Sequence, residues 1–219
     1  MKKFTALDGA AVIIWFLPLI YLYSIYASLP AIVPMHYGAD GIPNSYGTKA
    51  SFARAMMLMS GVGALTYLLM RFLPAIDPKK QAKYGDAVYK KLGLGVLIFL
   101  TALSIVIAYA TLHKGLKIEK VLFPLMGLLF AFLGNVMNNI KPNYFAGIRT
   151  PWTLEDEGTW RATHHLAARI WFVGGILITI VTLLVPGNYS SVIFPSAVAV
   201  MVIIPLVYSY VYYKKHRPA

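Results

Sequence analysis

Residues 92–112 read LGLGVLIFLTALSIVIAYATL and contain no Asp, Glu, Lys or Arg. A helix that crosses the hydrocarbon core of a bilayer needs about 20 apolar residues, and this stretch supplies them. Five further stretches have central parts that are equally free of charge. The six spans predicted from this pattern are 10–29, 53–73, 92–112, 121–140, 168–186 and 192–213.

The composition of the whole chain agrees with this pattern. Of the 219 residues, 58% are hydrophobic and 13% are charged, whereas soluble domains carry about 25% charged residues. We therefore predict an all-α integral membrane bundle of about six transmembrane helices that forms one membrane domain, 1–219. Within it we expect a two-span N-terminal module, 1–75, and a four-span region, 92–213. The chain has no cysteine, which excludes disulfides, thiolate catalysis and Cys-based zinc sites.

The distribution of basic residues predicts the orientation, because cytoplasmic loops carry an excess of Lys and Arg. With a cytoplasmic N-terminus, the outer side receives five of the 20 Lys and Arg residues, namely Lys49, Arg54, Lys114, Lys117 and Lys120. The others fall on the inner side, so both termini are expected in the cytoplasm. The net charge of +12 is then explained by basic residues that contact anionic membrane lipids. No direct nucleic-acid partner is expected.

Small residues predict where helices approach closely, because packing inside a bilayer relies on them. Gly61, Gly63 and Ala64 lie on the second span, Gly127, Ala131 and Gly134 lie on the fourth, and Gly174 and Gly175 lie on the fifth. We expect these residues to form close helix contacts without a role in function.

The spans lack the usual chemistry of transport and catalysis. Transporters coupled to ions or protons place ionisable residues near the middle of the membrane, and none lies near the centre of a span here. The motifs H-E-x-x-H, G-x-S-x-G and the P-loop are also missing. We predict a protein that is not an enzyme and has no cofactor and no metal. A transporter or lipid flippase stays an alternative, as does a membrane enzyme that uses Glu155, Glu157, His164 or His36 on a lipid-linked or peptide substrate.

The outer connection, residues 30–52, is one of two long loops with distinctive residues. It contains His36, Asp40 and Lys49 among several Pro and Gly residues. One interpretation is a loop shaped by turns, with Asp40 and Gly41 in one of them. A second interpretation is ligand contact through His36, Asp40 and Lys49, with His36 tuning binding between about pH 5 and 7. A closed metal site would have too few ligands.

The inner connection, residues 141–167, follows an amide-rich helix end. Asn135, Asn138 and Asn139 share one helix face by their spacing. Buried amides need partners, and Arg149 is the expected one because it has five donors.

Further along this connection, the spacing predicts a short helix. Thr153 precedes an acidic cluster, Glu155 to Glu157, as an N-cap precedes a first turn. We expect a helix over 154–166 along the inner interface, with Trp152 and Trp160 in the headgroups. The alternatives for this connection are a self-satisfied polar lid, a docking surface or small-ligand site, and catalysis by Glu155, Glu157 or His164.

Residues 134–154, GNVMNNIKPNYFAGIRTPWTL, and the following Trp160, Thr163 and His164 resemble the signature of the SdpI-type bacterial immunity proteins. The outer loop, with Pro34, His36, Gly41, Pro43 and Lys49, looks like the N-terminal module often fused to that family. One departure is His165, where the family pattern has Arg after the Thr-His pair.

The resemblance implies a multi-pass protein of the bacterial plasma membrane without catalytic activity. Family members protect the producing cell from a secreted membrane-active peptide, and some hold a small DNA-binding repressor at the membrane. It therefore implies a peptide toxin as the outer partner and a cytoplasmic repressor as a possible inner partner. The site residues expected on this basis are Asn135, Asn138, Lys141, Asn143, Arg149, Thr150, Trp152, Trp160 and His164 inside, and His36, Asp40 and Lys49 outside.

Overall fold

The computed structural model describes residues 3–38, 41–79, 85–113 and 115–216. The helices are α1 (Ala6–Ile25), the 3-10 turn η1 (Tyr26–Ser28), α2 (Lys49–Ile76), α3 (Asp86–Leu112), α4 (Glu119–Met137), α5 (Pro151–Glu155), α6 (Glu157–Leu184) and α7 (Gly187–His216). Two strands, β1 (Ile32–Tyr37) and β2 (Pro43–Thr48), lie between η1 and α2.

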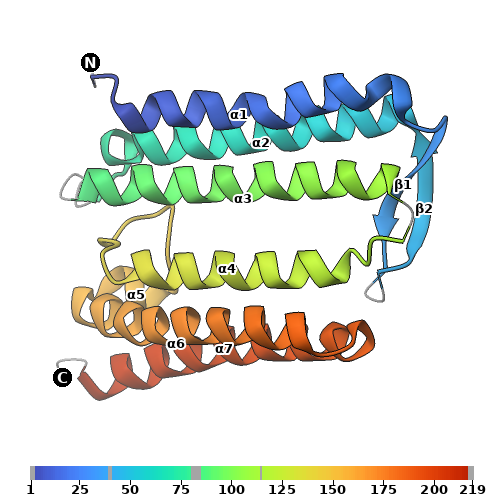
Figure 1. The fold of residues 1–219 in the computed structure, drawn as a ribbon. Coiled ribbons are helices and arrows are strands. Elements are labelled where there is room, and N and C mark those ends of the chain that lie inside the picture. Colours follow the sequence, from blue (N-terminus) through green and yellow to red (C-terminus); the bar gives the residue numbers. More distant parts are fainter. Residues whose placement is uncertain (1–2, 39–40, 80–84, 114, 217–219) are drawn as a thin grey trace.

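Six of these helices are long and apolar enough to cross a membrane, which confirms the all-α multi-pass bundle. They run side by side along one direction (Figure 1). The start of α1, the end of α7 and the short α5 lie at one end of the bundle, here called the α5 end. The two strands lie at the opposite end, here called the hairpin end.

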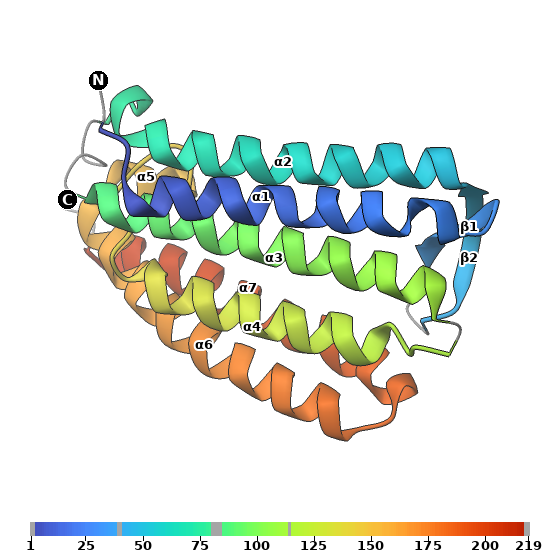
Figure 2. The ribbon, with the colours of Figure 1, turned by 45° about the horizontal axis from the view of Figure 1, so that its top comes forward.

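The bundle consists of two groups of three helices. α3 packs against α1 and α2, whereas α4 packs against α6, which packs in turn against α7. α3 and α4 contact each other across the two groups, and a second view shows the same grouping (Figure 2). The chain passes from one group to the other only once, in the connection between α3 and α4.

The tightest helix contact is that between α4 and α6, as the small residues predicted. A Cβ on Gly175 would overlap the backbone nitrogen of Ala131 and would lie 2.6 Å from the carbonyl oxygen of Gly127. A Cβ on Gly134 would overlap the backbone nitrogen of Phe172. Gly174 instead faces the side chain of Met201 on α7.

The outer connection contains a hairpin, which the sequence did not predict. β1 and β2 pair antiparallel, with Val33 opposite Gly47 and His36 opposite Ser45, and the register shifts on both sides of His36. Val33 is fully buried and packs with Leu29 and Phe52. The hairpin is therefore anchored to the helices and covers one end of the bundle (Figure 1).

Candidate functional site

The connection between α4 and α5 is organised around Asn143, which is fully buried. Its Nδ2 donates to the carbonyl oxygens of Lys141 and Ala146 at 2.8 and 3.0 Å. Its Oδ1 accepts from the backbone nitrogens of Phe145 and Ala146 at 2.8 and 2.7 Å. One amide thus satisfies four backbone groups of a loop that has no regular secondary structure, as buried polar groups require.

His164 and Trp160 support the next part of this loop. His164 Nδ1 bonds to the carbonyl oxygen of Trp160 at 2.8 Å, and its Nε2 accepts from the backbone nitrogen of Ile148 at 3.0 Å. The ring of His164 stacks on Trp160 with centroids 4.1 Å apart, and Trp160 Nε1 donates to the carbonyl oxygen of Ile140 at 2.8 Å. Gly147 has a φ of 111°, and a Cβ there would overlap His164 Nε2. This position therefore requires glycine for both its backbone conformation and its space.

The short helix α5 is capped and held against α7. Thr150 and Thr153 form a capping box, and Thr153 Oγ1 also donates to the carbonyl oxygen of Ile148 at 2.8 Å. Trp152 Nε1 donates to Ser209 Oγ at 2.8 Å, and its ring meets Tyr210 edge to face. The loop and α5 are thus bonded to α6 and α7 along their length.

The same loop is also bonded to the first group of helices. Tyr89 Oη on α3 donates to the carbonyl oxygen of Lys141 at 3.1 Å. The backbone nitrogen of Tyr144 donates to Asp77 Oδ1 at 3.1 Å, and Lys79 Nζ donates to the carbonyl oxygen of Leu154. Because residues 141–154 bond to both groups of helices, they form the joint between them at the α5 end.

The expected inner site residues fall into two classes. Asn143, Trp160 and His164 are buried and hold the loop in place, and Thr150 and Trp152 are half-buried in the same network. The exposed members are Asn135, Asn138, Lys141 and Arg149. Only the exposed class is available to a partner, so the candidate site consists of a surface and the framework that holds it.

Two expectations for the amide-rich end of α4 were wrong. Arg149 does not pair with the amides of α4: its Nη1 donates to the carbonyl oxygen of Tyr144, and the Asn138 amide oxygen bonds to His165 Nδ1 at 3.1 Å. Asn135, Asn138 and Asn139 are exposed, so they do not need a buried partner. The sequence spacing placed three amides on one face correctly but could not show that this face is open.

The separate helix expected over 154–166 is not formed. α5 ends at Glu155, Asp156 caps α6 by accepting from the backbone nitrogen of Thr159, and α6 then continues without interruption to Leu184. Hydrogen bonding with Thr159 holds the pKa of Asp156 below its usual range. The expectation that both tryptophans lie in the headgroups also fails, because Trp160 is only 2% exposed.

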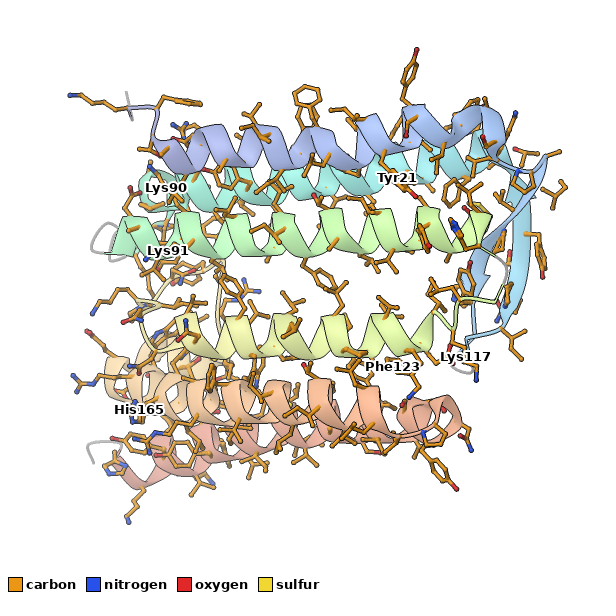
Figure 3. All side chains as sticks on the ribbon, viewed as in Figure 1. Tyr21, Lys90, Lys91, Lys117, Phe123 and His165 are labelled. Carbon is orange, nitrogen blue, oxygen red and sulfur yellow. The ribbon has the colours of Figure 1, made fainter. Side chains whose placement is uncertain are left out.

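A basic pocket of about 460 Å³ lies between α6 and α7 at this end, and the sequence reasoning missed it. Arg161, His165 and Arg169 are spaced four residues apart on α6 and line it together with Tyr208 and Tyr212. This spacing places three basic side chains on one helix face, and it is the signal that would have revealed the pocket. Figure 3 shows His165 at this end of α6, far from Phe123 of α4 at the hairpin end.

The residues expected to act outside lie on or beside the hairpin. His36 is exposed, and its Nδ1 lies 2.6 Å from Asn44 Oδ1. The Nζ of Lys49, at the start of α2, lies 5.1 Å from the ring centre of Tyr26. Asp40 lies outside the described residues.

The four residues considered for catalysis do not form one cluster. Glu155 Oε2 accepts from Tyr213 Oη at 2.8 Å, Glu157 is exposed, and both nitrogens of His164 are engaged in the loop. His36 lies at the opposite end of the bundle. Over the part of the chain that the structure describes, no group of three or more His, Cys, Asp or Glu side chains could hold a metal ion.

Comparisons with known proteins match both parts of the chain. Residues 139–209 match the model of the SdpI/YfhL protein family, and residues 13–60 match a domain of unknown function, DUF1648. The Immunity protein SdpI of Bacillus subtilis (strain 168) is 25% identical over 191 residues, which cover 87% of this chain and 88% of that protein. No solved structure matches significantly.

Proposed function

We propose that this SdpI-type family protein, a multi-pass protein of the bacterial membrane, confers immunity against a secreted membrane-active peptide toxin. The observation that carries the proposal is the similarity to a protein named for immunity, which extends over 87% of this chain. An alignment of 191 residues necessarily includes residues of both the hairpin and the α5 end. The relative therefore corresponds to the whole bundle and not to a single shared helix.

The proposed mechanism has two sides. A toxin contacts the hairpin end through the outer connection, to which His36, Asp40 and Lys49 belong in the sequence, and a cytoplasmic repressor docks at the α5 end. Because residues 141–154 bond to both groups of helices, their conformation depends on how the groups are placed. A toxin that favours one placement would shift the population toward the conformer that binds the repressor.

The exposed basic side chains of the loop 141–149 and of α6 support this choice of docking surface. They include Lys141, Arg149, Arg161 and Arg169, and these make no ion pair with any carboxylate among the described residues. A partner with an acidic patch would complement this surface in charge and would be attracted to it over distance. We therefore propose that the repressor contacts it through Asp and Glu side chains.

The first experiment measures survival of a sensitive bacterium that expresses this protein under a panel of secreted membrane-active peptides. Wild type is compared with Arg149→Ala and with Lys91→Ala. Lys91 is a matched control because it is an exposed basic residue near the same end, on α3 (Figure 3). Protection by wild type and Lys91→Ala that is lost in Arg149→Ala, at equal membrane levels, would support immunity and a role for the α5 end.

The other outcomes of the survival experiment have different consequences for the proposal. Protection by all three proteins would keep immunity and move the important surface to the hairpin end. A lack of protection against every peptide would count against the proposal and would direct attention to transport or to a membrane enzyme.

The two-sided mechanism has its own test, which is trypsin cleavage at Arg149 with and without a protective toxin. Unchanged cleavage would exclude it.

A further inference from the structure

A second pocket, of about 470 Å³, lies beneath the hairpin where the two groups of helices meet. It falls in the range of about 300–1,000 Å³ that is typical of ligand sites. The hairpin contributes Met35 and His36, α3 contributes Ile107, α4 contributes Glu119 and Phe123, and α7 contributes Phe194. Figure 3 shows Phe123 on α4 at this end. An occupant would touch both groups of helices and the outer hairpin together.

Glu119 is the unusual member of this pocket. It is only 7% exposed, and its carboxylate makes no hydrogen bond or ion pair with any residue that the structure describes. A carboxylate with so little exposure and no partner is costly, because burial removes part of the water that stabilises its charge. The position of Glu119 in the first turn of α4 offsets part of that cost through the helix dipole, but it supplies no partner for the side chain.

Two glycines make room for this carboxylate. Gly41 has a φ of 76°, and a Cβ there would overlap Glu119 Oε2. A Cβ on Gly187, at the start of α7, would lie 2.5 Å from Glu119 Oε1. These glycines are far apart in the sequence, and together they leave a space that the Glu119 side chain occupies.

Lys120, the residue next to Glu119, is engaged elsewhere. Lys120 Nζ donates to the carbonyl oxygens of Thr182 and Leu183 at 3.2 Å each, and also to that of Val185. It therefore caps the end of α6 and does not pair with Glu119. The other acids that the structure describes lie on or next to elements of the α5 end, which leaves Glu119 as the described carboxylate of the hairpin end.

The walls of the pocket suit an apolar group beside a positive charge. Phe123 and Phe194 stack with centroids 4.9 Å apart and an angle of 16°. Aliphatic side chains also line the pocket, namely Leu103, Ile107, Ile118 and Leu122. A cation near an aromatic ring face gains further attraction when water is excluded. His36 Nδ1 donates to the amide oxygen of Asn44, because an amide oxygen can only accept. In the neutral ring, Nε2 is therefore the nitrogen that can accept a hydrogen bond.

We infer that this pocket binds a Lys or Arg side chain of a peptide, with the cation on Glu119 and a neighbouring apolar side chain against Phe123 and Phe194. The inference rests on the proposed function in that the peptide would be the toxin. It adds the chemistry that the pocket selects, and it explains how an outer ligand would act on both groups of helices. Charge complementarity favours such a cation, since Glu119 is buried and has no partner among the residues that the structure describes.

The test uses the absence of native cysteine. Ser191 also lines the pocket, and Ser191→Cys places one thiol there in the full chain, held in nanodiscs of phosphatidylglycerol and phosphatidylcholine. The rates of modification by a cationic and an anionic methanethiosulfonate reagent report the local charge. We expect the ratio of cationic to anionic rate to fall by roughly tenfold in Glu119→Gln, to recover in Glu119→Asp and to be unchanged in Glu157→Gln. An unchanged ratio in Glu119→Gln would overturn the inference.

Binding is tested on the same thiol with two capped peptides, Ac-Leu-Phe-Lys-Leu-NH2 and its norleucine counterpart, and N-ethylmaleimide as the reagent. The lysine peptide should slow alkylation, and the norleucine peptide should not. Glu119→Gln should abolish the difference. Equal protection by both peptides would exclude recognition of the cation. Phosphatidylethanolamine can also be added to the nanodisc. If this lipid slowed alkylation of the thiol as much as the lysine peptide does, the pocket would be assigned to a lipid and the peptide site would be overturned. These measurements need no toxin, so their failure is distinguishable from loss of protection in the survival experiment.

Discussion

The backbone nitrogen of Ile148 donates to His164 Nε2 at 3.0 Å, and this bond fixes the loop before α5 to the side of α6. Removal of the ring in His164→Ala leaves that nitrogen without its partner and removes the stack on Trp160. The loss of one such bond costs about 1–3 kcal/mol. We therefore expect trypsin to cleave after Arg149 about tenfold faster in the variant, as measured by gel or mass spectrometry.

The neighbouring His165 provides the control for this experiment. It is exposed, and its bond to Asn138 lies outside the loop, so His165→Ala should be cleaved at the wild-type rate. Equal acceleration in both variants would indicate a general loss of stability and not a local role for His164.

Asn143 gives a prediction about stability. Asn143→Ala leaves the backbone nitrogens of Phe145 and Ala146 and the carbonyl oxygen of Lys141 without the bonds that the amide supplies. We expect the free energy of unfolding to fall by about 3 kcal/mol, measured by thermal or denaturant unfolding in detergent. Asn139→Ala changes an exposed amide in the same region and should stay within about 0.5 kcal/mol of wild type. A similar loss in both variants would argue that Asn143 does not organise the loop.

Gly175 and Gly61 give a pair of substitutions with opposite expected signs. Gly175→Ala forces a methyl group into the backbone of α4, because a Cβ there overlaps the nitrogen of Ala131. We expect a loss of about 1–3 kcal/mol from overpacking. The close contact expected at Gly61 is not formed, because its Cβ position has open space around it. Gly61→Ala should therefore be neutral or stabilise by up to about 1 kcal/mol through helix propensity. Melting temperatures in one detergent compare the two, and a stable Gly175→Ala protein would mean that α4 and α6 can separate at little cost.

The helices and their close contacts were predictable, because long charge-free stretches and small residues carry that information locally. Gly127, Ala131 and Gly175 are examples. The hairpin was not predictable in the same way, because its six-residue strands contain Pro and Gly and depend on burial of Val33 against distant helices.

The candidate site was predicted in composition but not in the roles of its residues. The spacing of residues 134–154 marked the loop, yet only the fold shows that Asn143 and His164 point inward while Arg149 is exposed. Glu119 was missed altogether. Its burial depends on Gly41 and Gly187, which are far from it in the sequence.

The orientation of the bundle gives the last prediction. The excess of Lys and Arg at the α5 end predicts that this end lies in the cytoplasm and the hairpin outside. Ser45 lies on the exposed strand β2, and Lys141 is exposed in the α5-end loop. Since the chain has no cysteine of its own, Ser45→Cys and Lys141→Cys each supply one thiol for a membrane-impermeant maleimide. In intact cells or spheroplasts, we expect labelling of Cys at 45 and none at 141 until the membrane is opened. The reverse pattern would place the hairpin in the cytoplasm, and then neither the outer toxin contact nor the inner docking surface could stand as proposed.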